Sequence, residues 1–193
     1  MPLIASRAGG SATSFGGLGA SVAPAAISAY ESIATVTLTS ATQDVNFTSI
    51  PQTFKHLQVR GLYRSASSVV YFNVTTSAGQ NWGDRQMGLV GNAGNNPSVF
   101  SSTGTVNKGQ EFDTYVSGLV ANMYGPLILD IFNYNDTNKK KVVKGYSGYP
   151  DGDSFEMYGA VFSVTNAITS IQIHANSTMD TNCTFGLYGI KGE

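Results

Sequence analysis

Apolar and polar residues alternate along the chain from about residue 30 to its end. The run IATVTL at 33–38 has a period of two, and LQVRGLY at 57–63 repeats the pattern. Such alternation is typical of a strand that buries one face. Strands of this kind are expected over residues 33–38, 57–63, 69–74, 112–116, 127–132, 142–146, 157–163, 168–174 and 184–190.

Clusters of Gly, Asn, Asp, Ser and Pro separate these runs, as at 77–81, 91–97, 133–138 and 150–154. They are typical of turns and loops. No segment carries apolar residues at helical spacing over three turns, so we expect no βαβ crossover and an antiparallel arrangement. Many short strands with Gly-rich turns predict an all-β, antiparallel, jelly-roll-like β-sandwich over residues 30–193.

Residues 1–29 differ from the rest because they are almost entirely Gly, Ala, Ser and Thr with a few apolar side chains. Small side chains bury too little area to offset the entropy of ordering a backbone. The segment is therefore either a flexible tail or an extended Gly/Ala/Ser-rich N-terminal arm that orders on a neighbouring subunit. Spaced apolar residues favour the arm, and the candidate interface residues are Leu3, Ile4, Phe15, Leu18 and Val22.

Composition excludes several functional classes. The chain of 193 residues has 11 basic and 12 acidic side chains, a net charge of −1 and 12% charged residues. We expect no nucleic-acid partner, because a basic stripe is missing. No apolar stretch is long enough for a spanning helix, so no membrane partner is expected, and the start does not resemble a signal peptide. A lone Cys183 excludes a disulfide framework and a Cys-based zinc site, and no cofactor is expected.

Catalytic chemistry is not indicated, so we do not expect an enzyme. His56 and His174 read as surface or edge histidines, and Cys183 as a small core or edge residue. The motifs of a nucleophile elbow or a phosphate-binding loop are absent. The lysine run at 139–141 reads as the solvated start of a strand.

One aromatic residue suggests a sugar contact. Trp82 lies in a predicted polar loop with Asp84 and Arg85 nearby, and an indole beside planar polar groups suits a pyranose ring. The alternative is that this Trp packs beneath the loop.

Several stretches together resemble a family of virion proteins from tailed bacteriophages, especially marine and cyanobacterial phages. They are residues 48–60 (TSIPQTFKHLQVR), 129–134 (LDIFNY) leading into 138–139, 167–171 (AITSI) and 185–192 (FGLYGIKG). The start, SRAGGS at 6–11 with Phe15 and Gly16, is similar to the Gly-rich N-termini of structural proteins in such phages. The chain departs from the longer fibre proteins because no shaft precedes the module.

The resemblance implies a structural part of the virion, assembled in the host cytoplasm, and supplies no catalytic residues. We expect a capsid decoration or cement protein, because nothing in the sequence forms an extended fibre. A tail fibre or tail appendage is the alternative, and a carbohydrate-binding module for host recognition is the second. The expected partners are further copies of the chain, as a homotrimer, and the major capsid protein or a tail protein, with a host surface glycan as a further candidate.

Overall fold

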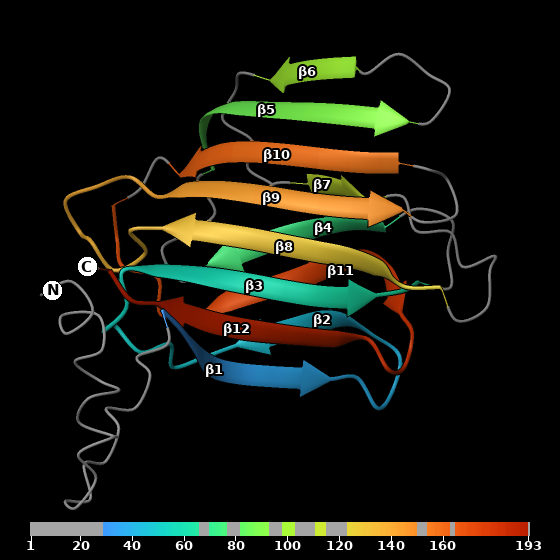
Figure 1. Ribbon diagram of the computed structural model, residues 1–193, viewed down its shortest axis with the longest axis horizontal. Helices are drawn as coiled ribbons and strands as arrows, with labels where there is room; N and C mark the ends of the chain where they lie inside the picture. Colours follow the sequence, from blue (N-terminus) through green and yellow to red (C-terminus); the bar gives the residue numbers. More distant parts are fainter. Residues whose placement is uncertain are drawn as a thin grey trace, which may run out of the picture.

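The computed structural model describes residues 29–65, 70–76, 82–92, 98–102, 111–114, 123–149, 154–162 and 165–192. These residues form two stacked antiparallel sheets, the larger in front of the smaller in Figure 1. The larger sheet has eight strands in the order β1-β12-β3-β8-β9-β10-β5-β6, and the smaller has four in the order β2-β11-β4-β7. The strands are β1 (Tyr30–Thr37), β2 (Thr42–Phe47), β3 (His56–Tyr63), β4 (Val70–Thr76), β5 (Trp82–Asn92), β6 (Ser98–Ser102), β7 (Glu111–Thr114), β8 (Gly125–Phe132), β9 (Val142–Tyr149), β10 (Ser154–Phe162), β11 (Ile171–Met179) and β12 (Thr184–Ile190).

The predicted all-β, antiparallel, jelly-roll-like sandwich is confirmed. Successive strands alternate between the two sheets from β1 to β5, and again from β10 to β12. The meander β8-β9-β10 remains within the larger sheet. Among the described residues, no helix is long and apolar enough to cross a membrane.

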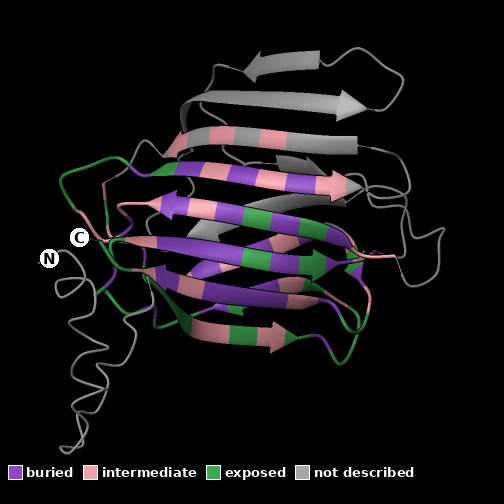
Figure 2. Cartoon of the chain, viewed as in Figure 1, coloured by how far each residue is buried: buried purple, intermediate pink, exposed green. Residues whose placement is uncertain are grey.

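The hydrophobic core lies between the two sheets. On β8, buried and more exposed residues alternate along the whole strand, as the purple and green bands in Figure 2 show. Alternate residues of one strand point to opposite faces, so one face of β8 packs inward. Buried core residues of the larger sheet are Leu57, Val59, Leu127, Leu129, Ile131, Val143, Phe185 and Leu187, and those of the smaller sheet are Val45, Phe47, Ile171, Ile173, Ala175 and Met179.

A glycine allows one close approach at the edge of this core. A Cβ atom at Gly189 of β12 would lie 2.3 Å from ring carbons of Phe54, which is itself buried. Any larger residue at this position would push the ring away. The loop before β3 can therefore lie directly on the inner face of β12.

Some strands differ from those predicted. β2, β5 and β6 lie outside the predicted strand ranges, and β5 begins at Trp82, where a polar loop was expected. β11 continues to Met179, beyond the predicted end at residue 174. Pairing with neighbouring strands decides these segments, because strand preference depends more on partners than on local composition. Residues 1–28 lie outside the described residues.

Candidate functional site

A row of side chains crosses the outer face of the larger sheet, the face turned toward the viewer in Figure 1. It is set by register, because each residue pairs with the next across adjacent antiparallel strands. Directly paired residues on one face of a sheet bring their side chains into contact distance. From β1 to β9 the row is Ser32, Tyr188, Gln58, Asp130 and Lys144.

Hydrogen bonds join Gln58 to Asp130 within this row and join Gln58 and Lys144 to neighbouring side chains. Gln58 Nε2 donates to Asp130 Oδ1 at 2.6 Å, and Arg60 Nε donates to Gln58 Oε1 at 2.5 Å. At the β9 end of the row, the pKa of Lys144 is raised mainly by a hydrogen bond with Tyr146, and the charge of Asp130 raises it further. Gln58, Asp130 and Lys144 are thus engaged with protein groups on the same face.

Two tyrosine rings enclose the guanidinium group of Arg60. Its central carbon lies 5.2 Å from the ring centroid of Tyr30 and 5.2 Å from that of Tyr188. A cation above an aromatic face is attracted by the negative charge of the π system. The arrangement fixes the orientation of Arg60 although its side chain is exposed.

Beside Arg60 the outer face is hollowed into a depression of about 340 Å³. Gly186 leaves room here, and a Cβ atom at this position would lie 2.9 Å from the ring of Tyr188. We call this hollow the outer-face depression. Its lining residues are Thr35, Arg60, Gly61, Leu62, Pro126, Leu127, Ile128, Thr184, Phe185, Gly186 and Tyr188.

The same face holds the large apolar side chains that the structure describes as exposed. Leu62 is 52% exposed and Ile128 is 36% exposed, and both line the outer-face depression. Tyr30 at 42% and Val142 at 43% lie on the same face but outside the depression. Exposed apolar side chains that gather on one face of a protein often mark an interaction surface, whereas singly scattered ones need no explanation.

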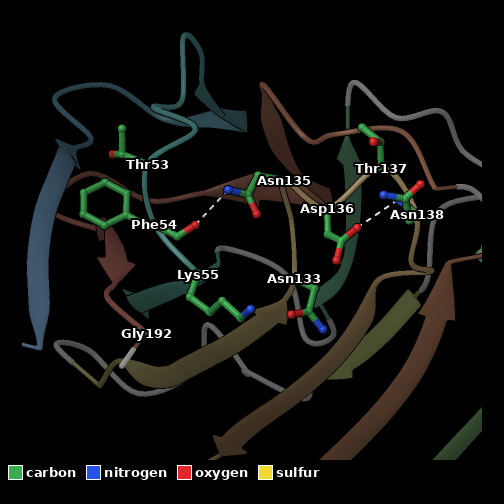
Figure 3. Close-up of a pocket in the computed structure, with 9 residues that line it drawn as sticks. All are labelled: Thr53, Phe54, Lys55, Asn133, Asn135, Asp136, Thr137, Asn138 and Gly192. Atoms are coloured by element: carbon green, nitrogen blue, oxygen red, sulfur yellow. Dashed lines mark hydrogen bonds between the residues drawn. The ribbon is translucent and has the colours of Figure 1, made fainter.

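A second hollow, which we call the polar cleft, lies at the opposite end of β3 and β8. It has a volume of about 580 Å³, and Figure 3 shows the side chains around it. Asn133 begins the β8–β9 turn with a φ of 52°, a left-handed conformation that Asn tolerates well. The lining residues are Thr53, Phe54, Lys55, Asn133, Asn135, Asp136, Thr137, Asn138 and Gly192.

Internal hydrogen bonds hold the wall of the polar cleft. Asn135 Nδ2 donates to the carbonyl oxygens of Gln52 and Phe54, at 2.9 and 3.0 Å. The Asp136 carboxylate accepts from the backbone N–H of Asn138 at 2.9 Å and lies 3.2 Å from Lys139 Nζ. The pKa of Asp136 is held below its ordinary value, mainly by the hydrogen bond from Asn138 and next by the hydrogen bond with Lys139.

Lys141 corrects the prediction for the lysine run, because its side chain is fully buried. Its Nζ donates to the carbonyl oxygens of Asp136, Lys139 and Thr165. Burial lowers the pKa of Lys141, and the charge of Asp136 opposes this effect. Lys139 and Lys140 are exposed, as expected. Lys141 therefore ties the β8–β9 turn to the segment before β11.

His56 joins β3 to the same turn. Its Nδ1 accepts a hydrogen bond from the backbone N–H of Asn133 at 3.0 Å, and its ring contacts Phe132 edge-on. Burial lowers the pKa of His56, and the charge of Lys55 lowers it further. The other histidine, His174, lies 2.7 Å from Asp44 on the smaller sheet.

The candidate residues predicted from the sequence lie partly on β5 and partly outside the described residues. Trp82, Asp84 and Arg85 lie on β5 rather than in a loop. Cys183 is buried in the core, as predicted. No group of three potential metal ligands occurs in the described part of the chain. The predicted interface residues Leu3, Ile4, Phe15, Leu18 and Val22 lie outside the described residues.

Sequence reasoning did not identify the outer-face row or the depression. The outward positions of LQVRGLY hold Gln58, Arg60 and Leu62, and the alternation itself marked them as facing away from the core. What the sequence lacked was the strand order, which places β12 and β8 on either side of β3.

Comparisons with known proteins identify no family. No family model and no curated protein matches the chain. Among solved structures, galectin LEC-6 of Caenorhabditis elegans matches with a TM-score of 0.34 and 8% identity, over 82% of this chain and 96% of that one. A toad ovary galectin in complex with thio-digalactose gives a TM-score of 0.33 and 14% identity, over 75% and 99%.

An alginate lyase, Aly36B, in complex with an alginate tetrasaccharide has a TM-score of 0.28 and 13% identity, over 82% of this chain and 80% of that one. At these scores the similarities carry no conclusion about a ligand or a reaction. The outer-face row, the depression and the polar cleft are therefore the basis of the functional argument.

Proposed function

We propose that this chain is a non-enzymatic structural component of a phage virion, and specifically a capsid decoration or cement protein. One observation carries the proposal. Among the described residues, the large apolar side chains that are exposed all lie on one face of the sandwich, and two of them line a depression there. Such a face suits packing against another protein, and the sequence resemblance supplies the phage particle as its setting.

The chemistry of the outer-face depression favours a protein partner over a sugar. A sugar site needs polar groups directed at hydroxyls and an aromatic ring with an available face. Here Arg60, the charged residue that lines the depression, donates to Gln58 and lies against the rings of Tyr30 and Tyr188. Apolar side chains such as Leu62 then provide the contact surface.

The charges on this face are also compatible with dense packing. Burying an unpaired charge is unfavourable, whereas a paired and hydrogen-bonded charge is tolerated. Asp130 accepts a hydrogen bond from Gln58 and pairs in register with Lys144. A neighbouring protein that covers this row would therefore cover two opposite charges on adjacent strands rather than one charge alone.

Imaging of purified virions tests the proposed function. A gold label is attached at the C-terminus, beyond Gly192, which lines the polar cleft and lies outside the outer-face depression. The proposal predicts label over the capsid surface. Label confined to the tail would replace the decoration role with a tail-fibre or tail-appendage role, and unlabelled particles would contradict the virion assignment.

Carbohydrate binding is the second candidate, and the polar cleft favours it. Amide, hydroxyl and carboxylate groups surround this cleft; Asn135 and Asp136 already make internal hydrogen bonds, but hydroxyl and carboxylate oxygens can each accept more than one, as a sugar requires. A glycan array with the full-length chain tests it, with Asn138→Ala at the cleft and Lys140→Ala as an exposed control in the same loop. Trp82→Ala tests the sequence-based candidate. Absence of any glycan signal, or signals unchanged in Asn138→Ala and Trp82→Ala, would contradict sugar binding at these positions.

A further inference from the structure

The outer-face depression has the shape and chemistry of a site for an apolar side chain. Gly186 lies within it, with Leu62 and Ile128 exposed around it. Leu127 and Phe185 also border it, but their side chains are buried in the core, so Leu62 and Ile128 supply its exposed apolar side chains. An aliphatic or aromatic group placed here would remove several apolar surfaces from water at once.

The first 28 residues of the chain contain apolar side chains of this kind. Phe15, Leu18 and Val22 are separated by Gly, Ala and Ser, so each could enter a hollow without bulky neighbours. Arg7 is the one charged side chain in this segment. Docking of the part around Phe15 would therefore bury no charge of the segment. Fully extended, 28 residues span up to about 100 Å, which is enough to reach an adjacent subunit.

The way the chain enters β1 favours a neighbouring copy as the acceptor. Lys191 N donates to the carbonyl oxygen of Ala29 at 3.0 Å, and this bond extends the pairing of β1 with β12 beyond Tyr30. The chain thus enters β1 along the strand direction. Thr35, which lines the depression, lies toward the other end of β1.

Reaching the depression of its own sheet would require the segment to reverse direction. Residues 20–29 contain no Gly, Asn or Asp, and the turn-compatible residues among them are Ser21, Pro24 and Ser28. The nearest preceding glycine is Gly19, which follows both Phe15 and Leu18 in the sequence. A segment that continues away from its own sheet reaches another subunit without such a turn.

We propose that the outer-face depression is the acceptor for residues 1–28 of a neighbouring copy of this chain, with Phe15 and Leu18 as the inserted side chains. This inference rests on the proposed assembly role and specifies its contact. Each copy would donate its segment to one neighbour and accept a segment from another, or two copies would exchange segments. Both arrangements give closed oligomers.

Photo-crosslinking of the full-length chain tests this contact. Phe15 is replaced by p-benzoylphenylalanine, unlabelled and ¹⁵N-labelled chains are mixed before assembly, and cross-linked peptides are mapped by mass spectrometry. The expected products join residue 15 to β3, β8 or β12 around the depression, in pairs of mixed isotope. Cross-links found exclusively within single chains, or to other parts of the molecule, would overturn the proposal.

A matched pair of substitutions gives the second readout. Leu62→Asp introduces a carboxylate inside the depression, two residues after Arg60. Val142→Asp introduces one on the same face outside it, two residues before Lys144. We expect Leu62→Asp to reduce the cross-link yield at least about tenfold, as a change of 1.4 kcal/mol in binding free energy would. Val142→Asp should leave the yield unchanged.

Thermal melts followed by circular dichroism check that both variants fold. We expect both to fold, because Leu62 and Val142 are exposed. Equal yields in the two variants would contradict docking in the depression. The virion assignment is tested separately by imaging. If imaging finds the chain on particles but residue 15 forms no cross-link to the depression, this contact is refuted and the proposed function is unaffected.

Discussion

At the scale of single residues, Lys141 shows how a buried charge can organise a loop. Three backbone carbonyls surround its Nζ, from Asp136, Lys139 and Thr165. A buried acceptor left without a donor costs roughly 1–3 kcal/mol. We expect Lys141→Met to lower the free energy of unfolding by about 2 kcal/mol or more, measured by urea denaturation. Lys140→Met, at an exposed neighbour, should change it by less than about 0.5 kcal/mol, and equal effects would contradict the structural role of Lys141.

His56 gives the fold a dependence on pH. Its pKa is lowered in the folded state by burial and by Lys55, so the unfolded chain binds the proton more tightly. Stability is then fully present above the ordinary value of 6.5 and decreases as the pH falls through that value. Protonation of Nδ1 would also remove its hydrogen bond from Asn133.

We therefore expect the free energy of unfolding to fall between about pH 7 and pH 5.5, where a histidine takes up its proton. Urea denaturation at a series of pH values measures it. His56→Gln should remove this component of the decrease, and His174→Gln, which leaves the contacts of His56 intact, should retain it. An unchanged pH profile in His56→Gln would refute this role.

At the scale of strands, Gly189 and Gly159 occupy opposite situations. A Cβ atom at Gly189 would overlap the ring of Phe54, whereas one at Gly159 would meet nothing within 4 Å. Forcing extra volume into a packed region costs about 1–3 kcal/mol. We expect Gly189→Ala to lower the melting temperature by several degrees and Gly159→Ala to leave it nearly unchanged, in a calorimetric comparison. Similar melting temperatures would show that Phe54 moves aside freely.

The elements also show how far the sequence can predict this fold. Strands with strict alternation, such as β8 and β12, were predicted because their inward residues are all apolar or Gly. β5 was not, because WGDRQMGLVGN shows no such alternation and its pairing with β10 and β6 decides its state. The outer-face row and Lys141 depend on register and on contacts between distant segments, which local patterns do not contain.

At the scale of the whole molecule, we propose that the sandwich presents one face of its larger sheet to other proteins. The core between the sheets provides stability, and the large apolar side chains that are exposed in the described part of the chain lie on the opposite side of the larger sheet. Contact through the outer-face depression would join copies of the chain. The predicted homotrimer is one closed form of such an assembly.

Sedimentation velocity of the full-length chain, measured over a range of concentrations, shows whether copies of the chain associate through the outer-face depression. The account predicts that the natural chain and Val142→Asp sediment at a multiple of the 20.3 kDa chain mass. Leu62→Asp should sediment as the single chain, because a carboxylate in the apolar depression opposes docking. A natural chain that remains a monomer at every concentration, or a Leu62→Asp variant that keeps the full oligomer, would contradict the account.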